Sequence, residues 1–224
     1  MTKILTLVTS CYPHRGIWQT IHDRDPDAII LCGYPLETNY KLENKILYLN
    51  CDDTYGGLPE KIICALDAVL QIEEFKNYTH ILKCDDKDLI VSKKTLTEEH
   101  IKIIEKSDYA GQKINYIEGS GPNSESKLRH YHYGRVSLYS KWFNRPYRDK
   151  WVDYASGTAY VLSRRALSLI SRTYSAKDKE TISDNYIYEA LMIGQILHRH
   201  AILPVKLPDV LVGSVIHTRV LPQF

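Results

Sequence analysis

The sequence predicts an α/β protein with a mostly parallel central sheet that is flanked by helices. Short apolar runs, typical of buried strands, recur at 3–10, 27–34, 45–51 and 79–84. A longer segment with helical spacing, 58–75, lies between the last two runs. The chain of 224 residues fits one domain, 1–224, better than two.

The elements of the first half can be placed in order. The first strand, KILTLVTS (3–10), ends at the loop CYPHRG, which contains the turn residues Pro13 and Gly16. Gly33 closes the second strand, and the polar turn DDTYGG follows the third. The predicted helix 58–75 has Pro59 in its first turn, where a missing N–H costs nothing. THILKC (79–84) is the fourth strand.

The second half is less regular. We expect a helix at 96–107, a strand that begins at Tyr109, a long polar and aromatic surface loop at 120–135, a strand or turn that passes into a helix at 157–174, a helix at 183–200 and a final apolar segment at 212–219. Long loops in compact domains tend to be functional or disordered.

Composition excludes some classes of function. The formal net charge of +2 and the lack of a long basic run give no reason to expect a nucleic-acid partner. The five cysteines form no CxxC or zinc-type spacing, and several end apolar runs, as buried thiols do. The cysteines therefore predict a reducing compartment, the cytoplasm. For a viral protein this would be the cytoplasm of the host cell. No stretch is long enough to cross a membrane.

The segment YTHILKCDDKDLIVS (78–92) raises the main question about function. Asp85, Asp86 and Asp88 follow a buried strand, and carboxylates this close repel one another unless a cation, a proton or water relieves them. One interpretation is a solvated turn in which Lys87 offsets the acids, and the other is a divalent metal site. In parallel sheets, ligands bind beyond the carboxyl ends of the strands. The loops 11–16 and 52–57 are expected at the same edge, which favours a site.

Three blocks then resemble, in the same order, motifs of the β-1,3-galactosyltransferase and Fringe-type family. DDTYGGLPEKIICAL is similar to D-x-Y-x-N-L-x-x-K, YTHILKCDDKDLIV to Y-x-x-K-x-D-D-D-x-x-V, and KWVDYASGTAYVLSRRAL to P-x-Y-x-S-G-x-x-Y-V-L-S. SDNYIYEAL stands where the family has E-D-V-x-x-G. The blocks cover roughly 50–195, and the ordered set is more specific than any one of them.

The chain also departs from the family pattern. The family's D-D-D becomes Asp85-Asp86-Lys87, with Asp88 one place later, and E-D becomes Ser183-Asp184. Eukaryotic relatives carry a membrane anchor and luminal disulfides, which this sequence lacks. These departures predict a viral or bacterial member, or a domain cut from a longer polypeptide.

The resemblance implies a metal-dependent glycosyltransferase, a hexosyltransferase of the GT-A (Rossmann-like) fold. It implies a nucleotide-sugar donor, most simply a UDP-sugar, a glycan or glycoprotein acceptor, inversion at the transferred carbon, and Mn²⁺ or Mg²⁺ on a D-x-D motif. Asp86 and Asp88 are the expected ligands, since alternate strand residues face the same way. His217 is the expected third ligand, with a structural histidine as the alternative. Asp85 is expected on the ribose or sugar.

Further residues are implied in donor binding. Tyr12 and Arg15 are expected to meet the uracil and the diphosphate, with an ordinary surface loop as the alternative. Asp53 is expected on the nucleoside, and Gly157 is expected to let the backbone approach the sugar. Lys61 and Lys83 are expected at the phosphates, although Lys61 also fits a charge on an exposed helix face.

The resemblance assigns the general base to Asp184, and ordinary capping of the helix that follows is the alternative. We therefore expect 1–92 to bind the nucleotide-sugar and metal, and 93–224 to bind the acceptor and supply the base. Within it, the stretch 129–135 with Trp142 and Trp151 fits either an acceptor site or a lid that packs on the core.

Two other classes of function stay open at this point. The altered motifs also fit a catalytically weak module that binds a nucleotide or a glycan. A sugar-nucleotidyltransferase is the alternative enzyme, although the N-terminal loop is not of the glycine-rich, basic kind that activates a triphosphate.

Overall fold

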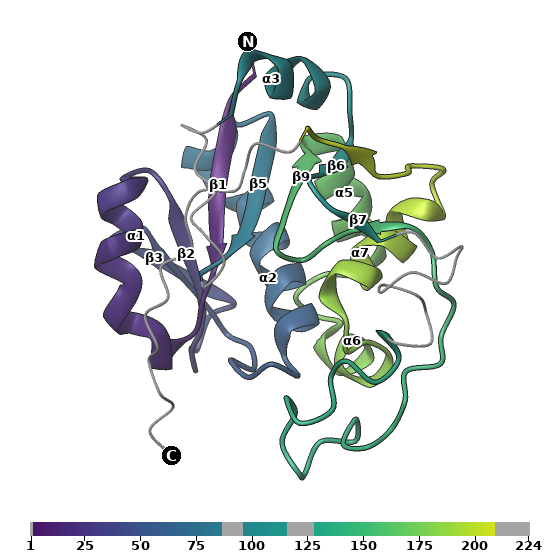
Figure 1. The fold of residues 1–224 in the computed structure, drawn as a ribbon. Coiled ribbons are helices and arrows are strands. Elements are labelled where there is room, and N and C mark those ends of the chain that lie inside the picture. The colour runs from purple at the N-terminus through teal and green to yellow at the C-terminus, as the bar shows by residue number, and fades with distance from the viewer. Residues whose placement is uncertain (1, 87–95, 116–127, 209–224) are drawn as a thin grey trace.

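The computed structural model describes residues 2–86, 96–115 and 128–208, and its centre is an eight-stranded sheet (Figure 1). The strand order is β10-β6-β9-β5-β1-β2-β4-β3. The strands are β1 (Ile4–Thr9), β2 (Ile29–Gly33), β3 (Tyr40–Glu43), β4 (Ile46–Leu49), β5 (His80–Asp85), β6 (Tyr109–Gly111), β9 (Ala159–Ser163) and β10 (Val205–Lys206). A separate pair is formed by β7 (Ile114–Asn115) and β8 (Tyr154–Ala155).

The centre of the sheet is parallel. Strands β4, β2, β1 and β5 pair in this order and direction, whereas β3 and β9 run antiparallel to their neighbours. In this register Thr9 of β1 lies between Leu31 of β2 and Asp85 of β5. The loops after β1 and β5 therefore leave the sheet side by side, at its carboxyl edge.

Helices cover both faces of the sheet (Figure 1). They are η1 (Tyr12–Ile17), α1 (Trp18–Arg24), α2 (Leu58–Gln71), η2 (Glu73–Phe75), α3 (Glu98–Ile104), α5 (Arg164–Thr173), α6 (Lys179–Asn185) and α7 (Glu189–His198). Alternate side chains of β1 enter different cores: Leu5 and Leu7 pack with α2, α5 and α7, whereas Ile4 and Val8 pack with α1 and α3. None of these helices is both long enough and apolar enough to cross a bilayer.

A third buried cluster holds the segment 128–152 against the start of α7. It contains aromatic rings of the segment, Trp142, Tyr147 and Trp151, and residues of β8 and α7 such as Tyr154 and Leu191. The ring of His132 lies beside those of Trp142 and Tyr188; its Nε2 is 2.8 Å from the carbonyl oxygen of Arg145 and its Nδ1 is 2.6 Å from the Tyr188 hydroxyl. Part of the expected surface loop is therefore an ordered, packed structure.

The structure confirms the four predicted strands and the helices at 58–71, 98–104 and 164–173. It adds β3, and it folds the loop CYPHRG into the 3₁₀ helix η1. The helix predicted at 183–200 is confirmed at 189–198 as α7, but its predicted start is wrong, because residues 183–185 end α6 and the chain leaves the helical conformation at Tyr186. The predicted apolar segment 212–219 lies outside the described residues.

Candidate active site

A cavity of about 570 Å³ lies at the carboxyl edge of the parallel strands. Its walls come from the ends of β1 and β5, the turn before α2, the loop before β9, the start of α7 and the segment 128–135. These pieces include five of the eleven predicted site residues, Asp53, Lys61, Asp85, Asp86 and Gly157. The edge predicted from the order of the strands is thus the edge at which the cavity forms.

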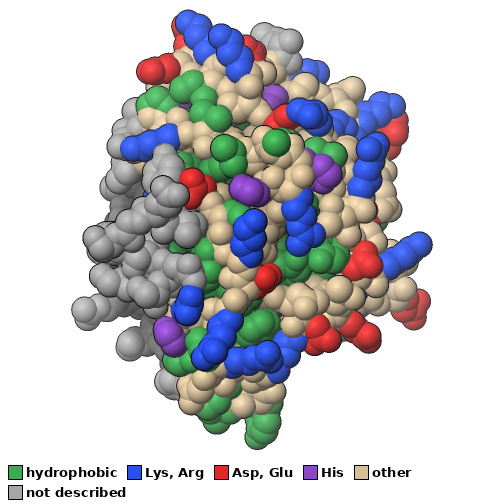
Figure 2. All heavy atoms as spheres, turned by 90° about the vertical axis from the view of Figure 1, so that its right-hand side faces the viewer, with side chains coloured by type: hydrophobic (Ala, Val, Ile, Leu, Met, Phe, Trp, Pro, Cys, Tyr) green, Lys and Arg blue, Asp and Glu red, His purple; other side chains and the backbone are tan. Residues whose placement is uncertain are grey.

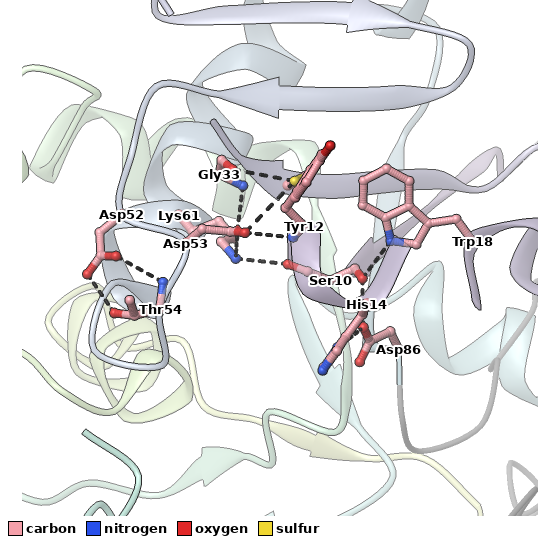
Figure 3. Close-up of polar contacts among 11 residues, drawn as sticks. Ser10, Tyr12, His14, Trp18, Gly33, Asp52, Asp53, Thr54, Lys61 and Asp86 are labelled. Atoms are coloured by element: carbon pink, nitrogen blue, oxygen red, sulfur yellow. Dashed lines mark hydrogen bonds and ion pairs between the residues drawn. The ribbon is translucent and has the colours of Figure 1, made fainter. Parts of the chain in front are cut away.

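Asp53 connects the end of β2, the loop after β1 and α2 (Figure 3). Its Oδ1 accepts hydrogen bonds from the Gly33 amide at 2.7 Å and the Lys61 ammonium at 2.6 Å. Its Oδ2 accepts one from the Tyr12 amide at 2.7 Å. Lys61 is buried and also donates to the carbonyl oxygen of Ser10 at 2.8 Å. This burial excludes the exposed helix-face role for Lys61, and the pair fixes the loop after β1 to α2.

Asp86 forms the second polar centre (Figure 3). Its Oδ2 accepts a hydrogen bond from the Ser10 hydroxyl at 2.6 Å and lies 2.7 Å from Nδ1 of His14. The Trp18 indole donates to the same Ser10 hydroxyl at 2.9 Å. Sequence analysis missed His14, although it lies in CYPHRG, a loop that was expected at this edge. Its position in that loop was the available signal.

Lys83 forms a third centre below the cavity floor. Its ammonium donates to Oδ1 of Asp85 at 2.6 Å and to the carbonyl oxygen of Gly157 at 2.5 Å, and it lies 3.7 Å from Oε2 of Glu189. Burial by itself lowers the pKa of Lys83, but the charges of Asp85 and Glu189 outweigh burial and raise it. Lys83 is therefore a buried cation whose bonds orient Asp85 and the Gly157 carbonyl.

Glu189 is a site residue that sequence analysis missed. It is the first residue of α7, lines the cavity, and accepts a hydrogen bond from the Tyr160 hydroxyl. Burial raises the pKa of its carboxyl group, and the nearby Lys83 limits the rise. A signal was present, because Glu189 and Gly194 have the spacing of E and G in E-D-V-x-x-G. Gly194 is needed there, since a Cβ would lie 2.6 Å from Cβ of Tyr154.

The structure does not bring Asp184 together with the other site residues. It lies in the last turn of α6, its side chain is 72% exposed, and it pairs with Lys141. It lines a separate hollow with Trp142 and Arg145. The helix-cap interpretation of this residue is wrong, because the N-cap positions of α6 and α7 are Asp178 and Tyr188.

The remaining predicted residues lie near the rim or outside the description. The Tyr12 ring is exposed beside the Tyr34 ring, with centroids 6.1 Å apart, and the Arg15 guanidinium stacks 4.5 Å from the Tyr12 centroid. A Cβ on Gly157 would meet Oε2 of Glu189 at 3.2 Å, so this glycine lets backbone and carboxylate approach. Asp88 and His217 lie outside the described residues.

The donors at Asp86 suit a divalent cation. A carboxylate and an imidazole are ligands that Mn²⁺ accepts, and here they already lie side by side. Within 2–86, 96–115 and 128–208, no group of three His, Cys, Asp or Glu side chains could hold a metal ion. The described residues thus supply two ligands of a possible site.

In open α/β sheets ligands bind beyond the carboxyl ends of the strands, and in this protein a cavity with acidic side chains lies at that edge. Comparison with protein-family models matches residues 36–203 to the galactosyltransferase family. The chain belongs to this family of hexosyltransferases, so its fold is the GT-A fold and its membership implies glycosyl transfer from a nucleotide sugar. A search of the curated proteins gives no match.

Proposed function

We propose that this protein transfers a hexose from a UDP-sugar to a hydroxyl group of a glycan acceptor, with a divalent cation and with inversion at the transferred carbon. The observation that carries the proposal is the convergence of Asp53, Asp85 and Asp86 in one cavity beyond the carboxyl ends of the strands. Family membership supports the donor and acceptor classes. The compartment we propose is the cytoplasm, in line with cysteines that are all free thiols.

The nucleoside is assigned to the part of the edge near Asp53. The exposed rings of Tyr12 and Tyr34 offer a stacking surface for a base, and Arg15 adds a cation beside them. Because both oxygens of Asp53 already accept bonds from the protein, its main task is to shape the loop. The Tyr12→Ala variant should then weaken UDP binding about tenfold, as loss of base stacking does, in an isothermal titration.

Asp86 and His14 are assigned as cation ligands, with Asp88 and His217 as further candidates from the sequence. When bound, Mn²⁺ would act as a Lewis acid on the diphosphate of the donor. The bond from Ser10 holds the Asp86 carboxylate in place, and Lys83 holds that of Asp85. Asp86→Asn should abolish Mn²⁺-dependent UDP binding. The control Asp52→Asn changes an acid that turns back onto Thr54, and it should bind as wild type does.

Glu189 replaces Asp184 as the proposed general base. Glu189 is the first residue of α7, and this helix start places its buried carboxylate in the wall of the cavity. Its raised pKa brings the carboxyl closer to the range in which a base works well. Asp184 stays a rival prediction, from its position in the sequence.

One experiment separates the two residues and tests the function. UDP release from a panel of UDP-sugars with Mn²⁺ and soluble acceptors should show turnover that requires both substrates. Glu189→Gln should lower kcat by roughly 10²–10⁴-fold and remove the acidic limb of the pH profile of kcat/KM, while UDP binding persists. Asp184→Asn should stay near the wild-type rate. UDP binding without turnover over the whole panel would instead indicate a binding module.

A further inference from the structure

The segment 128–150 carries an exposed apolar tip that the proposed reaction does not use. The segment reaches the lower end of the molecule in Figure 1, beyond the sheet. Tyr139 is 99% exposed and Leu138 is 71% exposed, and Phe143 is exposed nearby. Large side chains that gather in this way on a projecting loop usually mark a contact surface.

The same segment is strongly basic. It holds six cationic side chains and one acidic side chain, Asp149; the cations are Arg129, Arg135, Lys141, Arg145, Arg148 and Lys150. In Figure 2 hydrophobic side chains form the lower end of the molecule, and Lys and Arg side chains lie directly above them. Two of the cations are held beside the ring of Trp142, Lys141 at 5.4 Å and Arg145 at 5.6 Å from its centroid.

Internal packing holds the tip in place. The aromatic cluster around Trp142, Tyr147 and Trp151 anchors the segment to α7, and His132 closes it with bonds to the Trp142 and Arg145 carbonyls. The tip is therefore presented on a rigid base. Because Leu128, Tyr131 and Arg135 of the segment also line the cavity, the tip and the site lie on one structural unit.

We propose that the segment 128–150 docks this protein on the surface of an anionic phospholipid bilayer. A tip of leucine and aromatic side chains with cations above it matches an interface in which rings and aliphatic groups enter the headgroup region and Lys and Arg meet lipid phosphates. Sugar acceptors are usually held in concave sites with convergent polar groups, whereas this tip is convex. Because residues of the same segment line the cavity, docking would bring the cavity close to the headgroups. The use of this position in glycosyl transfer rests on the proposed function.

Co-sedimentation with vesicles tests the proposal without donor or acceptor. The protein should pellet with vesicles of equal parts phosphatidylglycerol and phosphatidylcholine, stay in solution with pure phosphatidylcholine, and be released by salt. The double variant Leu138→Ser, Tyr139→Ser should lose more than about tenfold in partitioning. The double variant Arg145→Gln, Arg148→Gln should partition onto the vesicles about fivefold more weakly for each cation removed.

Matched controls separate docking from folding and from catalysis. Leu203→Ser changes an equally apolar side chain that is 57% exposed outside the segment, and Lys106→Ala removes a cation next to α3; both should partition as wild type does. UDP release with a soluble acceptor should be unchanged in Leu138→Ser, Tyr139→Ser.

Three results would overturn the inference. The wild type could stay in solution with anionic vesicles, the double variant could pellet as strongly as wild type, or the vesicles could bind the chain equally with and without phosphatidylglycerol. A raised KM for a soluble acceptor in Tyr139→Ser, with no binding to vesicles, would reassign the tip to the glycan. If neither the wild type nor any variant released UDP, the proposed function would be refuted and the docking result would still stand.

Discussion

Lys83 shows how one buried side chain can organise a site. Its ammonium is surrounded by Asp85, the Gly157 carbonyl and Glu189, and the ring of Tyr160 lies 5.6 Å away. Bulk water does not reach the ammonium, because the side chain is only 1% exposed. Its removal should therefore leave two carboxylates without their cation.

We predict that Lys83→Met lowers the free energy of unfolding by about 3–5 kcal/mol, the usual cost of breaking a buried pair, and stops turnover. Glu189→Gln should lower the free energy of unfolding by less, because a neutral amide does not need a cation beside it. The double variant should be more stable than the sum of the two single effects, since the amide that replaces the Glu189 carboxylate no longer needs Lys83. Urea denaturation of all four proteins measures this coupling. Strictly additive effects would show that Lys83 and Glu189 act independently.

His132 provides a prediction about pH. Burial lowers its pKa, while the Arg145 and Trp142 carbonyls limit the shift. The folded protein therefore binds the proton less readily than the unfolded chain, whose histidine titrates near about 6.5. The resulting contribution to stability is present above that pH and is lost as pH falls below it.

We expect the fluorescence of Trp142 and Trp151 to change as pH falls from about 7 to about 5, because protonation of His132 loosens the aromatic cluster. His132→Gln keeps a hydrogen-bond donor and cannot titrate, so its signal should change less over this range. His200→Gln, which alters a histidine near the end of α7, is the control. If the fluorescence of His132→Gln changed with pH as that of the wild type does, the transition would belong to another titrating group.

At the scale of elements, α7 is held close to β8 by a glycine. A Cβ at Gly194 would lie 2.6 Å from Cβ of Tyr154, a distance that side chains do not accept, so α7 would have to move. Because Glu189 is on the same helix, such a shift would also displace a cavity wall.

Gly194→Ala should therefore lower stability by about 1–3 kcal/mol, the usual cost of overpacking, and lower the transfer rate as well. Thermal unfolding and UDP release measure the two effects. Gly16→Ala is the matched stability control, because a Cβ there meets nothing within 4 Å. Equal melting temperatures for Gly194→Ala and the wild type would show that the helix adapts without cost.

At the scale of the whole molecule, the two apolar cores on the faces of the sheet hold the described fold together. The cavity lies at the edge of this framework, where Lys61 and Lys83 already pair with Asp53 and Asp85. Stability should thus depend little on a cation, whereas donor binding should depend on it.

We expect a chelator to stop turnover and to leave the melting temperature of the protein without substrate unchanged. UDP with Mn²⁺ at one hundred times its dissociation constant should stabilise the fold by about 2.7 kcal/mol, as ligand linkage requires. UDP with chelator should stabilise it much less, and Asp86→Asn should behave like the wild type with chelator. Stabilisation by UDP that is indifferent to chelator would contradict the proposed cation site.

Four central strands of the sheet, and the edge at which the cavity lies, follow from the sequence alone. Apolar runs bounded by polar turns specify buried parallel strands, since those strands have no exposed face and read as continuous hydrophobic stretches. The loops after the runs 3–10, 45–51 and 79–84 then had to meet at the carboxyl edge. Asp53, Asp85 and Asp86 were found in this way, because they follow strands directly.

The tertiary structure decided which side chains face one another across that edge. The break between α6 and α7 moved the helix start from Ser183 to Glu189, and no local signal competes with the apolar periodicity that runs through Tyr186 and Ile187. His14 met Asp86 because β1 and β5 are neighbours in the sheet, although the two residues are 72 positions apart in the chain. Burial, which turns Lys61 and Lys83 into internal cations, is a property of the packed molecule and depends on contacts remote in sequence.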